Sequence, residues 1–301
     1  GLVTSAKIDA TVNMLAGAKA LKHGSRVRFH QGTTEVMARV SIGPECAQEY
    51  EGVTETVFPA MLEQGVSAFV RLHLERLVAV SRGDRFVLRT YSPPVTIAGG
   101  VVLDPRMSKT RLRSVAGCAR LRRLQASDTD AMEAMIEETA GIGLRIAELT
   151  PRVGLSEEQT IASVEQLETA KAIVHVGEKV ISSSMVDPVV DALRRIVTAY
   201  HEEQPLKAGI PREEARERLS RIAGDELFGY VLEILVESGE LRIGRHIALT
   251  EHRIELSDAE AVLKKRLAKL FFDGGLTPPD VGLWATEAGE TKDAVNRMLI
   301  M

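Results

Sequence analysis

The sequence predicts a multidomain β + α chain in which an antiparallel β-barrel precedes a series of small helical units. Apolar and polar residues alternate with a period of two through much of residues 1–105, with Gly, Pro and Asp between the runs. This pattern is typical of half-buried strands separated by turns. From residue 127 onward the apolar spacing becomes helical. Part of this second region repeats at an offset of 67 residues.

The strand-rich part contains six alternating runs. In the first, residues 7–14, every second residue is apolar, which places these residues on one face. The runs are residues 7–14, 26–30, 35–40, 68–74, 85–89 and 96–102. So many short strands with turns between them predict a small antiparallel barrel or sandwich. The pair Gly99-Gly100 in the last run predicts a bulge or the close approach of another backbone.

A basic connector, residues 106–125, follows the barrel. Seven basic residues and no acidic ones occupy it: Arg106, Lys109, Arg111, Arg113, Arg120, Arg122 and Arg123. A block of like charges is typical of a solvated or interaction segment.

The helical region begins at Ser127, which is placed to cap a helix containing Met132, Met135 and Ile136. Capping boxes predict two further helix starts, at Ser156 and Ser257. Between them, residues 189–200 carry an amphipathic stripe. These apolar stripes indicate core packing rather than a cofactor site.

An internal repeat organises these helices. Residues 164–182 align without gaps on residues 231–249, and each copy ends in a hairpin with glycine at its turn, Gly177 or Gly244. Three helices followed by a hairpin is the winged-helix layout. The predicted domains are therefore a barrel (1–105), the connector (106–125) and winged helices at 126–185, 186–252 and 253–301. The third has no hairpin, so we expect a protein truncated at both ends.

Composition and motifs exclude several functions. No apolar run is long enough to span a membrane, and no signal peptide is visible. The two cysteines, Cys46 and Cys118, form neither a disulfide framework nor a metal-ligand pattern. Common phosphate-binding, zinc-protease and serine-hydrolase motifs are absent. We therefore expect no catalytic residue, no metal and no cofactor in this chain, and a cytoplasmic location.

Charge points to binding instead. The net charge of -4 conceals two opposite halves, because residues 1–125 carry 18 basic against 10 acidic residues, and residues 126–301 carry 20 against 32. Alternating arginines in the strands could present a row of charge to phosphates, although an ordinary solvated sheet face explains them as well. The helices in the recognition position are acidic and would repel nucleic acid. Candidate phosphate contacts are Arg26, Arg28, Arg85, Arg111, Arg113, Arg242 and Arg245.

Two segments of the strand-rich part resemble a known family. Residues 20–40, with the motif Arg-Val-Arg-Phe-His, and residues 82–105, with Arg-Phe-Val-Leu-Arg and Thr-Ile-Ala-Gly-Gly, are similar to the third domain of bacterial selenocysteine-specific elongation factors. That barrel is shared by relatives of elongation factor Tu. The winged helices that follow, and the similarity of residues 205–214 to the second winged helix of the family, narrow the resemblance to the selenocysteine factor.

The resemblance implies that the barrel contacts the T-arm of an aminoacylated tRNA. Carried over position by position, the implied contacts are Lys22, His23, Thr33, Thr34, Arg89, Thr90 and Gly99. Cations, hydroxyls and a glycine backbone suit contact with phosphates and 2′-hydroxyls. The loop Tyr91-Ser92-Pro93-Pro94 departs from the glycine-rich loop of elongation factor Tu.

The implied function is delivery of selenocysteinyl-tRNA to the ribosome at recoded UGA codons, with the acidic arm acting as a spacer. The resemblance also implies that GTP, Mg and the mRNA insertion hairpin bind elsewhere in the family's architecture, in a GTP-binding domain and a fourth winged helix. Two alternatives remain open at this stage. One is the C-terminal part of another translational GTPase or a protein-interaction scaffold, and the other is a winged-helix DNA-binding regulator.

Overall fold

The computed structural model describes residues 4–45, 58–254, 258–275 and 280–299. Cys46 and Ser257 lie outside these ranges. The chain divides into two compact units, residues 1–185 and 186–301, and each is described by itself. None of the helices in the described ranges is long and apolar enough to cross a membrane.

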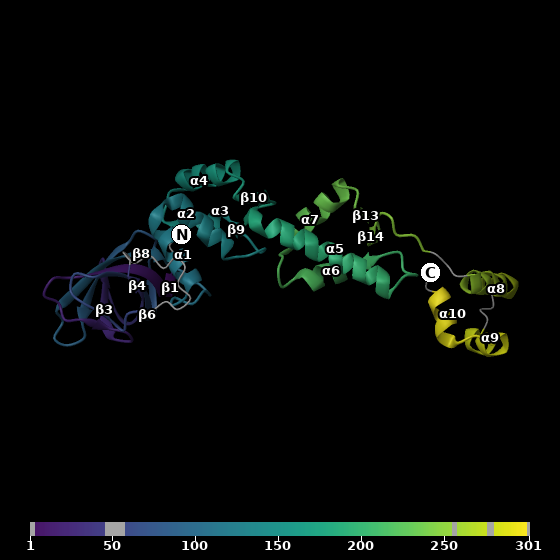
Figure 1. The fold of residues 1–301 in the computed structure, drawn as a ribbon, viewed down its shortest axis with the longest axis horizontal. Coiled ribbons are helices and arrows are strands. Elements are labelled where there is room, and N and C mark those ends of the chain that lie inside the picture. The colour runs from purple at the N-terminus through teal and green to yellow at the C-terminus, as the bar shows by residue number, and fades with distance from the viewer. Residues whose placement is uncertain (1–3, 46–57, 255–257, 276–279, 300–301) are drawn as a thin grey trace. The chain divides into compact units, whose positions relative to one another are not determined.

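The first unit opens with a closed antiparallel barrel, with strand order β1-β6-β4-β3-β7-β8 (Figure 1). Its strands are β1 (Thr4–Met14), β3 (Arg26–Gln31), β4 (Thr34–Glu45), β6 (Ser67–Ala79), β7 (Arg85–Thr90) and β8 (Thr96–Asp104). A short pair, β2 (Leu21–Lys22) with β5 (Met61–Leu62), accompanies them. The six predicted runs all coincide with barrel strands, which confirms the predicted fold class.

Apolar side chains at alternate strand positions fill the barrel interior. Ile8, Ala10 and Val12 of β1 are fully buried, and the same holds for every second residue of β6 from Ala68 to Leu72. Gly100 confirms the predicted close approach, because a Cβ there would lie 2.3 Å from both the Phe86 ring and the Thr11 carbonyl oxygen. The barrel is thus closed around a core in which one strand position admits only glycine.

A winged helix completes the first unit. It consists of α2 (Asp128–Glu137), β9 (Leu144–Arg145), α3 (Ile146–Val153), α4 (Glu157–Thr169), β10 (Ile173–Val176) and β11 (Lys179–Ser182), with a turn of 3-10 helix at Ser183–Met185. Ser127 caps α2, and Ser156 forms the predicted capping box with Gln159 at α4. The strand β9 adds a third strand to the hairpin.

The second unit repeats this layout. It runs through α5 (Val186–Glu203), β12 (Ile210–Pro211), α6 (Arg212–Leu219), α7 (Asp225–Glu237), β13 (Leu241–Ile243) and β14 (His246–Leu249). The sheet order β10-β11-β9 of the first winged helix corresponds strand for strand to β13-β14-β12 of the second. Three helices follow, α8 (Asp258–Gly274), α9 (Val281–Ala288) and α10 (Lys292–Leu299). The short strands β9 and β12 are too brief for periodicity to reveal.

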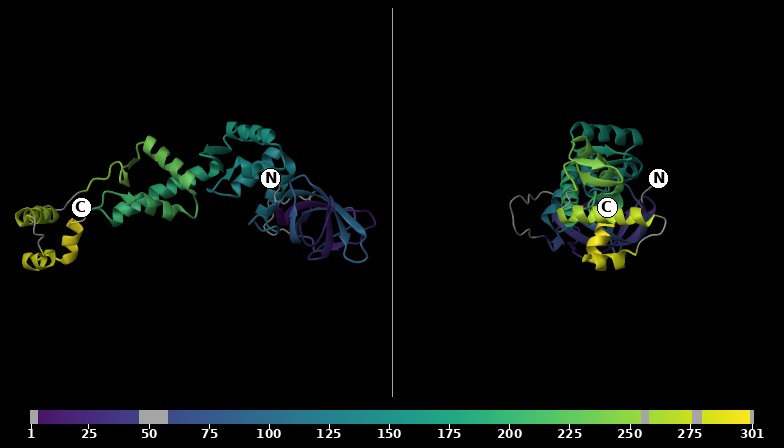
Figure 2. Two further views of the ribbon diagram at one scale, coloured as in Figure 1. Left: turned by 180° about the vertical axis from the view of Figure 1, so that it is seen from behind. Right: turned by 90° about the vertical axis from the view of Figure 1, so that its right-hand side faces the viewer.

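The basic connector, predicted to be a solvated or interaction segment, is helical in its second half. Its second half is α1 (Val115–Ala126), capped by Ser114, and Leu121 and Leu124 are buried in the core of the first winged helix. Figure 2, left, shows the teal helices of the first unit beside the purple and blue barrel strands. The connector is therefore partly a structural helix, because its apolar residues have a core to enter.

Six charged side chains form a network where the barrel meets the first winged helix. Asp9 and Asp104 come from the barrel and are fully buried. Arg71 binds Asp9 with two contacts, at 2.7 and 3.0 Å, and Arg120 of α1 contacts both aspartates. Arg152 of α3 contacts Asp104 and Glu138. Three arginines thus face three carboxylates, as buried charges require.

Candidate nucleic-acid interface

The outer surface of the barrel carries four arginines that we call the basic face: Arg26 and Arg28 on β3, and Arg85 and Arg89 on β7. They point outward because Val27, Phe29, Phe86 and Leu88 fill the alternate inward positions. Register places Arg28 directly opposite Arg89. The backbone thus gathers residues 60 positions apart in sequence into one row of charge.

Two members of the basic face already hold carboxylates. Arg26 binds Glu75 in a two-pronged pair, with Nε to Oε1 at 2.8 Å and Nη2 to Oε2 at 2.9 Å. Arg28 pairs with Glu35. The arginine hydrogen bonds lower the pKa of both glutamates. All four side chains are one-third to one-half exposed, and exposed ion pairs of this kind are weak and screened by solvent, so a phosphate can replace the carboxylate at little cost.

The other two arginines are less engaged. Arg85 is exposed and makes no ion pair with any residue of the described ranges. Arg89 is half-buried, and its Nε is enclosed without a hydrogen-bond partner among the described residues. A buried N–H without a partner carries a desolvation cost.

The remaining barrel candidates lie around this face. Lys22 and His23 precede β3 and are exposed, and the Ile42 N–H donates to His23 Nδ1 at 3.1 Å. At the opposite end of β3, Thr33 lies in the turn, and Thr34 begins β4 and pairs with Gln31. Because β3 has six residues, the two sites are about 20 Å apart along the strand direction. Gly99, on β8, pairs with Val87 of β7.

Thr90 has a different local role. Its hydroxyl donates to the Pro93 carbonyl and accepts from the Val95 N–H at 2.9 Å, so it shapes the loop between β7 and β8. The Thr90 N–H also donates to the Val95 carbonyl at 2.9 Å. The hydroxyl is therefore engaged within its own loop.

Tyr91, in that loop, was not among the predicted contacts. Its side chain is exposed, and the guanidinium groups of Arg26 and Arg28 lie 5.3 and 5.8 Å from its ring centroid. Arg28 Nε also donates to the Tyr91 carbonyl oxygen at 3.2 Å. Only the strand pairing reveals this proximity, because Tyr91 is more than 60 residues from both arginines in sequence.

The connector and the second wing hold the other candidates. Arg111 is exposed, and Arg113 donates to the Phe58 carbonyl oxygen at 2.7 Å. Arg242 reaches the His252 carbonyl oxygen at 3.4 Å. Arg245, at the hairpin turn, is exposed and has no ion-pair partner in the described part of the chain. Arg242 and Arg245 lie in the second unit.

The helices in the recognition position are acidic at their surfaces, as predicted. Exposed carboxylates on α4 and α7 are Glu157, Glu158, Glu165, Asp225, Glu233 and Glu237. On α6, Arg216 is bound to Glu213 and Arg218 to Glu214. These helices offer no basic surface to a nucleic-acid groove.

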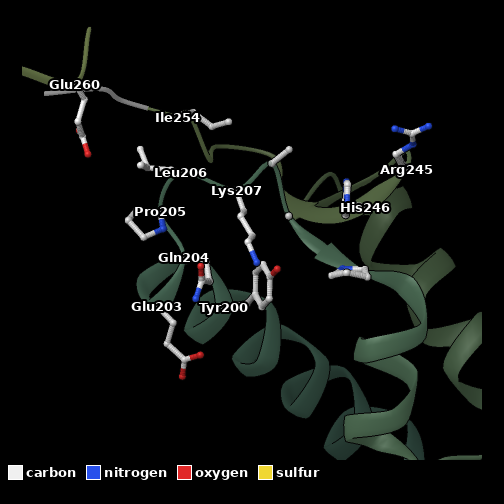
Figure 3. A pocket seen from close by; sticks show the side chains of 13 residues that line it. Tyr200, Glu203, Gln204, Pro205, Leu206, Lys207, Arg245, His246, Ile254 and Glu260 are labelled. Atoms are coloured by element: carbon white, nitrogen blue, oxygen red, sulfur yellow. The ribbon is translucent and has the colours of Figure 1, made fainter. Parts of the chain in front are cut away.

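A cavity of about 630 Å³ lies beside the second wing. Its lining mixes both signs of charge, with Lys207, Arg245 and His246 against Glu203 and Glu260. Lys207 extends toward the Tyr200 ring, 5.8 Å from its centroid (Figure 3). Mixed charge gives this cavity no preference for an anionic ligand.

The described residues contain no group of three or more His, Cys, Asp or Glu side chains arranged to hold a metal ion. Cys118 is buried, and desolvation raises the pKa of its thiol. These observations leave the charged surfaces as the features to be explained.

Comparison with known proteins agrees with this architecture. A family model described as the beta-barrel domain of selenocysteine-specific elongation factor matches residues 8–109, and one described as elongation factor SelB, winged helix, matches residues 194–247. The first covers the barrel, and the second covers most of the second winged helix.

Two proteins match nearly the whole chain. A selenocysteine-specific elongation factor of Desulfomicrobium baculatum is 23% identical over 282 residues, which span 92% of this chain and 42% of the relative. The crystal structure of a bacterial selenocysteine-specific elongation factor, EF-Sec, shares the fold with a TM-score of 0.57 at 16% identity, covering 98% of this chain and 41% of that one. The chain thus spans about two fifths of the length of these proteins. With its barrel and its winged helix both matched by models of one family, the chain belongs to the selenocysteine-specific elongation factors.

Proposed function

We propose that this chain serves in a factor that delivers selenocysteinyl-tRNA to the ribosome at recoded UGA codons, and that its barrel contacts the tRNA. The observation that carries the proposal is the basic face on a barrel of this family. Family membership supports tRNA as the ligand, and the arrangement of Arg28 beside Arg89 suits a ribose–phosphate backbone. Lys22 and His23 extend the surface at one end, and Thr33 and Thr34 at the other.

In this proposal the winged helices form a spacer arm. Exposed carboxylates on α4 and α7 keep the arm from adhering to RNA, because like charges repel phosphates. Arg242 and Arg245 of the second wing, and Arg111 and Arg113 of the connector, are proposed as secondary phosphate contacts. The mRNA hairpin would bind a fourth winged helix of the family's architecture.

The whole factor would act as a GTPase in the cytoplasm, with GTP and Mg held by the family's GTP-binding domain. The residues of this chain would contribute to tRNA binding rather than to hydrolysis. Figure 1 shows the barrel strands that would carry this role in purple and blue.

Charge reversal tests the assignment. In K22E/R89E, we expect the affinity of the chain for selenocysteine tRNA to fall at least tenfold, with a shallower dependence on salt concentration because fewer phosphates are neutralised. K171E, a charge reversal of the same sign at an exposed lysine of the first winged helix, is the control. An unchanged affinity in K22E/R89E would show that the barrel assignment is wrong.

Binding to duplex DNA tests the main alternative, a DNA-binding regulator. The acidic surfaces of α4 and α7 argue against it. The full chain is the appropriate sample, because a piece beginning at residue 126 would lack α1 and the core residues Leu121 and Leu124. A salt-sensitive gel shift with duplex DNA as strong as that with tRNA would favour the regulator.

A further inference from the structure

Tyr91 has three properties expected of an uncharged side chain that contacts RNA. Its side chain is 53% exposed. It lies beside two arginines of the basic face, Arg26 and Arg28. Its hydroxyl has no hydrogen-bond partner among the described residues.

The loop holds this side chain in place. Thr90 and Val95 close the loop with two backbone-directed hydrogen bonds of 2.9 Å, and Arg28 Nε donates to the Tyr91 carbonyl. The two guanidinium groups lie over the ring. The ring therefore loses little conformational freedom when a ligand arrives.

The chemistry of the ring complements that of the arginines. Guanidinium groups neutralise phosphates and do not distinguish RNA from DNA, because both carry the same phosphate. An aromatic ring packs on a sugar or base, and a phenolic hydroxyl can exchange hydrogen bonds with a ribose 2′-hydroxyl. A tyrosine set among phosphate-binding arginines thus lies where it can reach the sugar edge of a bound backbone.

We propose that Tyr91 contacts a ribose of the bound RNA and supplies a preference for RNA over DNA that the arginines cannot. This inference rests on the proposed function, since it assumes that the basic face binds the tRNA. It adds a contact that does not depend on charge.

The test uses the full chain and two labelled probes, an RNA hairpin with the T-arm sequence of selenocysteine tRNA and its all-deoxy counterpart. In Y91A, we expect the RNA affinity to fall about 5- to 20-fold, with the slope of log affinity against log salt unchanged. In Y91F, we expect the RNA-to-DNA affinity ratio to shrink about 3- to 10-fold, because only the hydroxyl is lost. V95A, at an exposed position in the same loop, is the matched control.

The possible outcomes are distinct. If Y91A and Y91F bind both probes as the unaltered chain does, while R89E weakens RNA binding, the Tyr91 contact is wrong and the basic face stands. If Y91A loses affinity and its salt slope also becomes shallower, Tyr91 acts only by orienting Arg26 and Arg28, which overturns the ribose contact. If R89E has no effect on RNA binding, the proposed function itself fails.

Discussion

Arg152 of α3 and Asp104 of β8 join the first winged helix to the barrel through a buried, two-pronged ion pair. Nε lies 3.0 Å from Oδ1 and Nη2 lies 2.7 Å from Oδ2. The side chains are 5% and 0% exposed. Because Asp104 ends the last barrel strand, this pair fixes the winged helix at the point where the chain leaves the barrel.

Breaking this pair should destabilise the first unit. In R152A, we expect the free energy of unfolding to fall by about 3–5 kcal/mol, because Asp104 stays buried with one fewer cation. Urea denaturation followed by circular dichroism measures the change. R145A, whose 56% exposed side chain is 3.5 Å from Glu178, should cost less than about 1 kcal/mol. Equal losses in the two variants would mean that the buried network does not hold the winged helix.

The two adjacent glycines of β8, Gly99 and Gly100, allow a matched pair of alanine substitutions. A Cβ at Gly100 would meet the Thr11 carbonyl oxygen at 2.3 Å, whereas the nearest atom to a Cβ at Gly99 is 3.9 Å away. We expect G100A to lower the free energy of unfolding by about 2 kcal/mol or more, since backbone must move, and G99A to change it by less than about 1 kcal/mol. Thermal unfolding of both variants checks this, and a G100A chain as stable as G99A would contradict the close approach.

Acid should weaken the second unit through His201. Burial, then the charges of His252 and Arg242, lower the pKa of His201 from 6.5 to about 4. The Leu249 N–H donates to its Nε2 at 3.2 Å, and its ring stacks on His252 with centroids 3.6 Å apart. His201 is therefore protonated below about pH 6.5 in the unfolded state, but only below about pH 4 in the folded state. Stability is full above pH 6.5 and falls as the pH drops from 6.5 to 4.

A shift from 6.5 to about 4, at about 1.4 kcal/mol per pKa unit, limits this loss of stability to about 3.5 kcal/mol. Unfolding curves of the chain at several pH values measure it. In H201Q, the loss of stability between pH 6.5 and 4 should be smaller than in the unaltered chain. An identical pH profile in H201Q would show that His201 is not the titrating group.

Acidic residues on α4 should limit RNA binding by the arm. Glu158 and Glu165 are exposed and make no ion pair within the described ranges. In E158K/E165K, we expect affinity for a non-specific RNA duplex at low salt to rise about 3- to 10-fold, since phosphate repulsion becomes attraction. E158Q/E165Q should give a smaller rise. If both variants bind as the unaltered chain does, the acidic surface does not keep RNA away.

Much of the fold follows from local patterns. Alternation in β1 and β6 predicts the residues that fill the barrel interior, and the capping residues Ser127 and Ser156 predict two helix starts, because both signals depend on neighbours in sequence. Alternation does not predict the burial of Asp9 or Phe69, which are covered by the part of the first unit that follows the barrel. The strand register, by contrast, is set by the closure of the barrel. Contacts such as Arg120 with Asp9, 111 residues apart, and Arg28 opposite Arg89 therefore could not be derived from periodicity.

The candidate site shows the same division. The arginines of β3 and β7 could be named from the sequence because they alternate with apolar residues. Tyr91 could not be named from the sequence, since it is a candidate only because Arg26 and Arg28, on another strand, lie beside its ring. The charge of the connector predicts a solvated or interaction segment, but it does not identify the three carboxylates that Arg120 contacts in the folded unit.

Hydrogen exchange with and without selenocysteine tRNA tests the central claim most directly, because it locates the bound RNA on the intact chain. We predict that tRNA slows amide exchange in peptides covering residues 22–34 and 85–99, and leaves α4 and α7 unchanged. Protection confined to α4 or α7, with none on the barrel, would contradict the account.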